Sequence, residues 1–383
     1  MRNFLIATLV STSALTLAAA AENSAPVVRH PYAITHTPPV GTVCRDCGAP
    51  EGTPAPNPPP HFNPLAASDQ ELQHYGFPPR PDQQTDPDGF AFWKKIVTAP
   101  VVRIQPKLQA TTIKNSPARI LAISPTTRVD NAATAADATS SNWSGYAIYN
   151  TANPFHANGT YVYGAFTVPA VSNYSCDGGW DYSSAWVGID GWGSSDVFQA
   201  GIESDAYCSG STKSSYYSAW YEWYPYSETR ISSPGVAPGD HIGVYIWTVS
   251  ATAGYYYMVN WSQGTASSLE FYAPSGTKLV GNSMEWIVER PGVNGGLATL
   301  SQYTALPWEW AHGESPKAFE FSPRRAQSTA TIYDITMMGS SALSCGYATP
   351  NNATNHLNTS GDSYYIAGSS IWFFDEQGLN NCN

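Results

Sequence analysis

Residues 160–168 read TYVYGAFTV, a short alternating run of the kind that forms a β-strand with one face against a core. Turn-forming pairs such as Pro234–Gly235 and Asn294–Gly295 separate this run from similar ones. The other runs span residues 185–189, 216–224, 241–249, 255–261, 268–272, 284–289 and 364–374. Short, regularly spaced strands predict an all-β fold, a sandwich or a barrel, without a long amphipathic helix.

The part of the chain before these strands differs in composition. Residues 48–61 read GAPEGTPAPNPPPH, which is incompatible with a helix or a central strand. Residues 94–128 carry seven Lys and Arg and no acidic residue, whereas residues 136–383 hold 7 Lys and Arg against 20 Asp and Glu. A small-residue stretch, NAATAADATS at 131–140, lies between them and suggests a linker with a processing site.

These shifts predict three segments. They are a signal peptide at 1–21, an irregular Pro-rich propeptide at 22–137 with a basic stretch at 94–128, and a catalytic domain at 138–383. The basic stretch would dock on an acidic cleft through ion pairs that weaken in acid, so that the propeptide acts as an intramolecular inhibitor. The alternative is a leader that binds a surface and has no inhibitory role.

The first 21 residues have the plan of an exported chain. Arg2 precedes a short apolar run, and residues 18–21 offer a small-residue cleavage site. No later run has the roughly 20 apolar residues of a membrane helix. We therefore expect a secreted protein without a membrane anchor, and a monomer by default.

Six cysteines are present, and an even count in an exported chain predicts disulfides. Pairing of Cys176 with Cys208 and of Cys345 with Cys382 is favoured because each pair closes a local loop. Cys44 and Cys47 form a tight disulfide or half of a metal site, and the disulfide is favoured because no second pair of ligands accompanies them.

Several catalytic designs have no counterpart in the sequence. There is no G-x-S-x-G or H-E-x-x-H motif, no pepsin-type D-T-G or D-S-G, no Gly-rich phosphate loop, and the eight histidines are scattered. We therefore expect neither a metal nor a cofactor. The acidic second part argues against nucleic acid as a partner.

Carboxylates, amides and aromatic residues remain, gathered in three clusters. They are WVGID at 186–190 followed by Gln199, AWYEWYP at 219–225, and MEWIVER at 284–290. Strand alternation predicts that Trp220, Glu222 and Tyr224 share one face, and that Glu285, Ile287 and Glu289 share another. Carboxylates among rings suit a groove in which partial burial raises a carboxyl pKa and allows acid or base catalysis.

The clusters alone leave other interpretations open. A carbohydrate-active sandwich, either a glycosidase or a glycan-binding module, also combines aromatic side chains with paired carboxylates. A sandwich without catalysis could carry Glu on its outer face by chance.

The clusters resemble the glutamic peptidase (eqolisin) family. The similar pieces are SNWSG at 141–145, AWVGIDG at 185–191, FQAG at 198–201, AWYEWYP at 219–225 and EWIVE at 285–289, in the order of the family. The resemblance implies an acidic β-sandwich of two curved antiparallel sheets (a concanavalin- or lectin-like jelly roll) behind a signal and a basic propeptide. It implies an acid endopeptidase that acts on polypeptides.

Carried over by motif, the catalytic pair is Gln199 and Glu289. Glu289 would take a proton from a water that attacks the peptide carbonyl and return it to the leaving amine, while Gln199 orients the water and stabilises the oxyanion. Substrate-binding or supporting positions implied by the resemblance are Trp143, Trp186, Asp190, Glu222 and Tyr224. Arg290 departs from the family pattern, so its charge could lower the pKa of Glu289.

Overall fold

The computed structural model describes residues 52–84, 86–130, 133–149, 159–173, 176–314 and 331–338, and the strands at 348–352, 356–358, 363–367 and 370–375. The expected signal peptide and the cysteines 44, 47, 345 and 382 lie outside the described residues. Within the described ranges, no helix is both long and apolar enough to cross a membrane.

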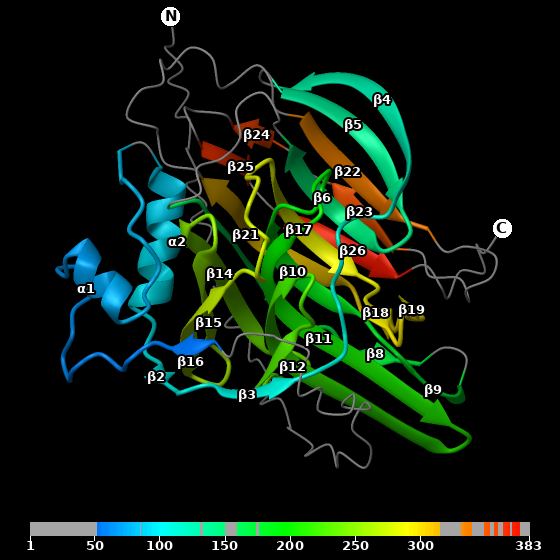
Figure 1. The fold of residues 1–383 in the computed structure, drawn as a ribbon, viewed down its shortest axis with the longest axis horizontal. Coiled ribbons are helices and arrows are strands. Elements are labelled where there is room, and N and C mark those ends of the chain that lie inside the picture. Colours follow the sequence, from blue (N-terminus) through cyan, green and yellow to red (C-terminus); the bar gives the residue numbers. More distant parts are fainter. Residues whose placement is uncertain are drawn as a thin grey trace, which may run out of the picture. The chain divides into compact units, whose positions relative to one another are not determined.

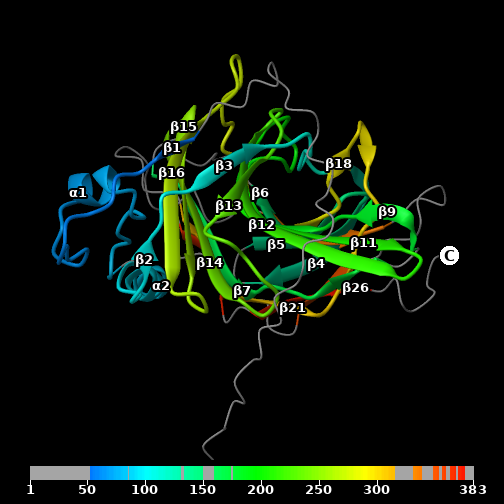
Figure 2. The same ribbon diagram turned by 90° about the horizontal axis from the view of Figure 1, so that it is seen from below.

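Nearly all of the regular structure is β, arranged in layers as in a β-sandwich (Figures 1 and 2). The first layer pairs its strands antiparallel in the order β13 (Thr229–Ser233), β12 (Thr212–Tyr224), β11 (Val197–Ser209), β10 (Ser184–Ile189), β17 (Ser283–Glu289), β6 (Trp143–Tyr149) and β22 (Thr331–Met337). The second layer runs β16 (Thr265–Tyr272), β15 (Ala253–Asn260), β14 (His241–Ser250), β7 (Tyr161–Thr167), β21 (Leu306–Glu314) and β26 (Ser370–Asp375).

Shorter strands complete the two layers. β23 (Ala348–Asn352) pairs with both β22 and β26 and so joins the layers, β25 (Ser363–Ala367) pairs with β21, and β24 (His356–Asn358) pairs with β25. The remaining pairs are β9 (Asp177–Asp181) with β11, β18 (Gly292–Val293) with β19 (Gly296–Leu297), and β8 (Val171–Ser172) with β20 (Gln302–Tyr303). The jelly-roll connectivity stays a prediction.

The main core lies between the two layers. Val187 and Trp286 from the first layer and Phe166, Val244 and Phe271 from the second belong to one cluster of buried side chains. Full burial of one such side chain contributes roughly 1.5–3 kcal/mol. Alternation along each strand therefore leaves the polar residues of the first layer on its opposite face.

The expected disulfide between Cys176 and Cys208 is present, with the two Cα atoms 4.4 Å apart. It ties the segment before β9 to the far end of β11.

The segment before the sandwich is more ordered than the sequence suggested. It contains β1 (Thr53–Pro54), α1 (Asp69–His74), α2 (Pro87–Val97), β2 (Val102–Arg103), β3 (Lys107–Ala110), β4 (Ile120–Asp130) and β5 (Ala133–Ser140). The expectation of an irregular segment is wrong for these residues. A capping box of Ser68 and Glu71 begins α1, and Asp86 caps α2 with Pro87 in its first turn.

Helix α2 packs on the outer face of the second layer. Phe92, Trp93 and Ile96 are fully buried there, and the ring of Phe92 stacks on Tyr163 with centroids 4.2 Å apart. At the start of the helix, Asp86 Oδ2 lies 3.0 Å from His312 Nε2. Figure 2 shows both helices on the outside of β14, β15 and β16.

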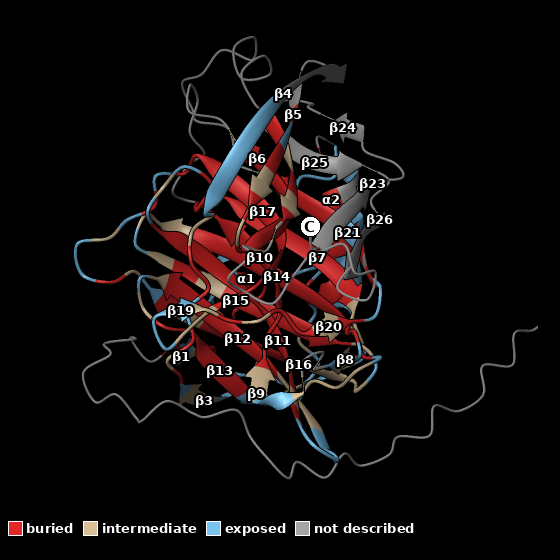
Figure 3. Ribbon diagram, turned by 90° about the vertical axis from the view of Figure 1, so that its right-hand side faces the viewer, coloured by how far each residue is buried: buried red, intermediate tan, exposed pale blue. Residues whose placement is uncertain are grey.

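The small-residue stretch at 131–140, expected to be a linker, is a strand over its described residues. β5 runs parallel to β22, which pairs with β6 on its other side. The domain boundary at 137/138 stays a prediction and falls inside this strand. β4, in contrast, is exposed along its first residues and is coloured pale blue in Figure 3.

The basic stretch contacts rings and carbonyl groups rather than carboxylates. Lys95 Nζ lies 4.8 Å from the ring centroid of Trp261, the guanidinium carbon of Arg103 lies 4.8 Å from that of Phe77, and Lys114 Nζ donates to the Pro225 carbonyl. No basic side chain of this stretch forms an ion pair with a carboxylate in the described part of the chain. The expectation that ion pairs hold the stretch on the sandwich is therefore wrong for the described residues.

Candidate active site

The site is built on the face of the first layer that points away from the main core, which we call the site face. A second buried cluster lies there and contains Trp143, Trp186 and Trp220, whereas Trp223 and Trp286 point into the main core. The strand alternation predicted from the sequence is thereby confirmed for β12 and β17. The strand order places β11 and β17 on either side of β10.

Glu289 is fully buried and accepts three hydrogen bonds. Its Oε1 accepts from the Ser116 backbone N–H at 3.0 Å and from Asn142 Nδ2 at 3.1 Å, and its Oε2 accepts from Trp186 Nε1 at 3.1 Å. Burial raises the pKa of Glu289 well above its usual value, and these donors oppose that rise because they favour the charged form.

Gln199 lies opposite Glu222 on β12 and Gly188 on β10. Its Nε2 donates a short hydrogen bond to the backbone carbonyl of Asn115. Its Oε1 is buried and accepts no hydrogen bond from the described residues. The side chain therefore has a fixed donor and a carbonyl oxygen that is open to a further donor.

Glu222 is also fully buried on the site face. Its Oε2 accepts from the backbone N–H of Asn115 at 2.9 Å and from Asn115 Nδ2 at 3.2 Å. Burial raises the pKa of Glu222 well above its usual value, and the nearby carboxylates of Glu228 and Glu289 raise it further. No hydrogen bond joins Glu222 to Gln199 within the described residues.

Glu228 belongs to a buried charged group that the sequence did not indicate. Its Oε1 pairs with Arg230 Nε at 3.1 Å, and Arg230 Nη2 lies 3.4 Å from Asp205 Oδ2. Its other oxygen, Oε2, lies 3.3 Å from Asn115 Nδ2. The Arg230 guanidinium thus fixes the carboxylate of Glu228, which faces Asn115.

Asp190 has a different place from the one expected. Its backbone has φ of 70°, and its carboxylate accepts from the backbone N–H groups of Val280, Gly281 and Asn282 at 2.7 to 3.0 Å. These contacts fix the loop that leads into β17. Asp190 contacts neither Gln199 nor Glu289. Any effect of Asp190 on these two residues therefore passes through the position of β17.

The other expected site residues are on the site face. Trp143 Nε1 donates to the Ser116 carbonyl at 2.9 Å, and the rings of Trp143 and Trp186 meet edge to face with centroids 4.9 Å apart. Tyr224 is half-buried and packs against the tryptophan cluster. Arg290 donates to the Ser141 carbonyl at 2.7 Å, and burial lowers the pKa of its guanidinium to about 10.

An extended segment, residues 113–119, covers the site face. It belongs to the predicted propeptide at 22–137, which we call the leader from here on. In Figure 1 it is the cyan stretch that passes in front of β10 and β11 on its way from β3 to β4. Asn115 and Ser116 make its contacts with Glu222, Gln199 and Glu289. These three candidate side chains therefore contact two consecutive residues of the segment.

Sequence reasoning missed Asn115, Ser116, Asn142 and Glu228. Asn142 lies in the SNWSG motif next to Trp143, and this position was the one sequence signal that could have indicated a role for Asn142 in the site. Asn115 and Ser116 are more than 80 residues from the nearest part of the pair, Gln199, so no local pattern could connect them.

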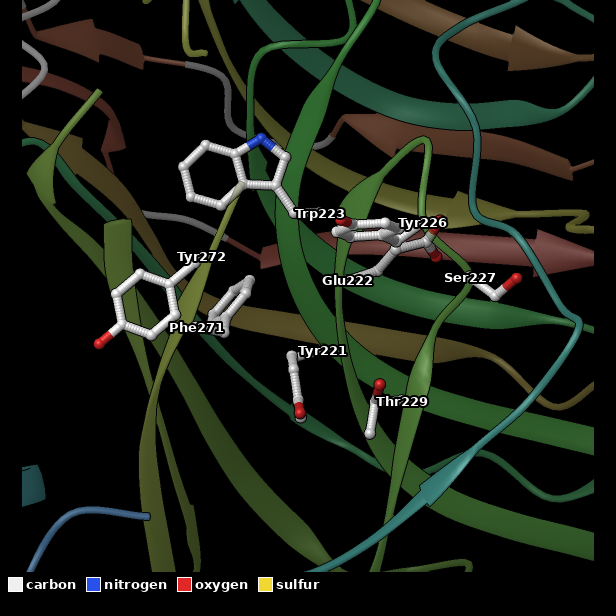
Figure 4. Close-up of a pocket in the computed structure, with 8 residues that line it drawn as sticks. All are labelled: Tyr221, Glu222, Trp223, Tyr226, Ser227, Thr229, Phe271 and Tyr272. Atoms are coloured by element: carbon white, nitrogen blue, oxygen red, sulfur yellow. The ribbon is translucent and has the colours of Figure 1, made fainter. Parts of the chain in front are cut away.

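A separate aromatic pocket lies on the other side of β12, lined by Tyr221, Glu222, Trp223, Tyr226, Ser227, Thr229, Phe271 and Tyr272 (Figure 4). Rings from β12 and β16 supply most of its wall. Glu222 lines this pocket and also binds Asn115 through its carboxylate, so the pocket and the site face share this residue.

Comparisons with known proteins identify the family of the chain. A model of the Peptidase A4 family matches residues 141–356, more than half of the chain. Aspergillopepsin-2 of Aspergillus niger is 30% identical over 218 residues, which cover 52% of this chain and 72% of that protein. Scytalidopepsin B of Scytalidium lignicola is 34% identical over 125 residues, 32% of this chain and 43% of that protein.

Among solved structures, scytalido-glutamic peptidase with a transition state analog inhibitor aligns with a TM-score of 0.42 and 21% identity, over 61% of this chain and 98% of that chain. The family match and the aspergillopepsin-2 relative leave no support for the carbohydrate-active alternative. The chain belongs to the Peptidase A4 family and is a glutamic peptidase, a hydrolase that acts on peptide bonds.

Proposed function

We propose that this peptidase is a secreted acid endopeptidase, made as a zymogen, in which Glu289 and Gln199 form the catalytic pair. Glu289 removes a proton from water as the water attacks the substrate carbonyl, and then delivers that proton to the leaving nitrogen. Gln199 Nε2 donates to the carbonyl oxygen as negative charge develops on it.

One observation carries this proposal. A peptide group with its N–H on Glu289 and its C=O on Gln199 lies across the site face. Peptide hydrolysis needs a proton at that nitrogen and a hydrogen-bond donor at that oxygen, and the two side chains supply them from β17 and β11.

The buried environment of Glu289 supports a role in proton transfer. Burial raises the pKa of Glu289, while Trp186 and Asn142 donate to the carboxylate and favour its ionised form. The base works only when it is ionised, so its raised pKa sets the acid side of the activity profile.

The leader supports the zymogen proposal because residues 113–119 lie where a substrate would bind. Polypeptides are the substrates, and the leader is the intramolecular inhibitor that must leave the site face first. The other proposed features are secretion and a monomeric state, which rest on the signal-like first 21 residues and on the default for a secreted hydrolase.

The test is digestion of casein at acidic pH by the full-length protein after acid exposure. We expect digestion by the wild type, without inhibition by pepstatin, and a loss of at least about 1,000-fold for Glu289→Gln. Glu309→Gln is the control, because Glu309 is a half-exposed carboxylate on β21 away from the site face. Equal digestion by wild type and Glu289→Gln, with both folded by circular dichroism, would refute the assignment.

A further inference from the structure

The leader binds the site face as an extended strand with hydrogen bonds on both sides. Lys114 and Gly292 exchange backbone hydrogen bonds at 3.0 and 2.8 Å, and Glu228 N–H donates to the Ile113 carbonyl at 2.9 Å. Beyond the centre, Ala118 N–H donates to the Gly191 carbonyl at 3.1 Å. Paired backbone contacts of this kind hold a bound peptide in one register, as in strand addition to a sheet edge.

In this register one peptide group meets both members of the catalytic pair. The Asn115 carbonyl accepts from Gln199 Nε2, and the Ser116 N–H donates to Glu289 Oε1 at 3.0 Å. We infer that the Asn115–Ser116 peptide bond is the bond that the enzyme cleaves in its own leader, and that the pocket around Asn115 selects a carboxamide on the acyl side of the cleaved bond.

The step is a hydrolysis that balances with one water. The water oxygen bonds to the carbonyl carbon of Asn115, and one water proton passes to Glu289. The bond from that carbon to Ser116 N then breaks, and Glu289 returns its proton to the departing nitrogen. The products are a carboxylic acid at Asn115 and an amine at Ser116.

The side chain of Asn115 is bound by complementary polar groups. Ser184 Oγ donates to Asn115 Oδ1 at 2.6 Å, while Asn115 Nδ2 donates to Glu222 Oε2 at 3.2 Å and to Glu228 Oε2 at 3.3 Å. Both carboxylates and Ser184 are buried, and so is Asn115. A carboxamide is the side chain that accepts at one end and donates twice at the other.

Other side chains of similar size fit this pocket poorly. Leucine would leave Ser184 Oγ and Glu228 Oε2 without this partner in a buried place, and Glu222 Oε2 would keep only the backbone N–H of residue 115. Aspartate would bring a third carboxylate against Glu222 and Glu228. A site built to hydrogen-bond a polar group rejects an apolar analogue strongly for this reason.

The residues that follow the Asn115–Ser116 bond are held mainly by hydrogen bonds to their backbone carbonyls, not by a polar pocket like the one around Asn115. Trp143 Nε1 donates to the Ser116 carbonyl, and Asn142 Nδ2 lies 3.2 Å from the Pro117 carbonyl. Pro117 also disfavours a helical conformation at Ser116, which keeps the strand extended. Selection therefore falls on the acyl side of the bond, at Asn115.

This inference rests on the proposed function, and the first experiment separates the two. The full-length protein is exposed to acid, and the fragments are identified by N-terminal sequencing and intact mass while casein digestion is followed in parallel. We expect a fragment that begins at Ser116 from the wild type and none from Glu289→Gln. Asn115→Leu should slow this cut at least about tenfold, and Gln109→Leu, an amide replaced on β3 of the same leader, should not.

A second experiment avoids any folding defect of the leader variants. Mature enzyme is given the peptide TTIKNSPARI, residues 111–120, and the same peptide with Leu in place of Asn. We expect cleavage between Asn and Ser, with kcat/KM at least about tenfold lower for the Leu peptide. In the Ser184→Ala enzyme the ratio of the two kcat/KM values should fall about fivefold, because one hydrogen bond to the amide is lost.

The possible outcomes separate the two proposals. This inference is overturned, and the proposed function stays intact, if casein digestion depends on Glu289 but the leader is cut at another bond. The same holds if the two peptides have equal kcat/KM. Absence of any Glu289-dependent digestion overturns the proposed function itself.

Discussion

The protonation state of Glu289 depends on its hydrogen-bond donors, and Trp186, like Asn142, is a donor that neither the leader nor the substrate brings. Its Nε1–H contacts Glu289 Oε2 at 3.1 Å and favours the ionised carboxylate. Trp186→Phe removes the donor and keeps most of the ring. We expect the pKa of Glu289 to rise, so that the acid limb of the kcat/KM profile moves to higher pH.

Trp220 provides a matched control for that prediction. It lies in the same tryptophan cluster, and its Nε1 has no hydrogen-bond partner among the described residues. Trp220→Phe should leave the acid limb in place. An equal shift in both variants would mean that ring packing, rather than the hydrogen bond, sets the profile.

Short motifs that resemble the family carry Gln199, Glu289, Trp143 and Trp186. In the structure the first three of these side chains contact residues 115 and 116, and Trp186 contacts Glu289. The catalytic roles of Gln199 and Glu289 stay a proposal. Strand period predicted one face for Trp220, Glu222 and Tyr224 and one for Glu285, Ile287 and Glu289, but it could not predict that strand pairing brings the two faces together. The contacts of Asp190 could not be predicted in the same way. Its motif places it at the end of β10, but the sequence does not show which backbone N–H groups its carboxylate binds. Asn115 could not be predicted, because its role depends on where a distant, irregular-looking segment crosses the sheet.

At the scale of elements, α2 fastens the leader to the outer face of the second layer. Phe92 is fully buried there, and its ring stacks on Tyr163. In the uncut Glu289→Gln background, Phe92→Ala should lower the free energy of unfolding by about 3 kcal/mol or more, measured by urea denaturation. Leu65→Ala, at a residue that is 40% exposed, should change it by less than about 0.5 kcal/mol.

Helices α1 and α2 were not predicted from the sequence, and the reason is physical. Prolines surround them and suggest an unstructured segment, yet Ser68 with Glu71 and Asp86 with Pro87 are local start signals of helices. The stretch at 131–140 misled in a different way, because small residues suit a linker as well as a strand that lies beside a partner. In both cases tertiary packing decided between local alternatives.

At the scale of the whole molecule, buried carboxylates link stability to pH. Burial raises the pKa of Asp196 and of Asp205 to about 7 and raises that of Glu203 and Glu285 well above the usual range. In the unfolded chain these groups titrate near pH 4. Between about pH 4 and 7 the folded state therefore binds more protons, so its stability falls as pH rises through this window.

We therefore expect a lower Tm at about pH 7.5 than at about pH 4.5 for the uncut Glu289→Gln protein, measured by circular dichroism. Adding Glu285→Gln should reduce the difference, because one group with a raised pKa is removed. A Tm that rises toward neutral pH would contradict this account. Such a rise would instead favour a dominant contribution from ion pairs between the basic stretch at 94–128 and the acidic sandwich, because these pairs weaken in acid.

The leader reaches two opposite faces of the sandwich, with α2 on one and residues 113–119 on the other, and β3 pairs with β13 between them. A single cut after Asn115 would leave the helices and β3 attached. The cut would divide the covering segment: residues 116–119 would stay joined to the sandwich through β4, while residues 113–115 would belong to a separate chain together with the helices and β3. That chain would be held by affinity instead of by covalent connection, and its effective concentration would fall to its real one. Activation would accordingly include a dissociation equilibrium that dilution shifts toward the free enzyme, so a concentrated secretion would stay partly inhibited until it was diluted.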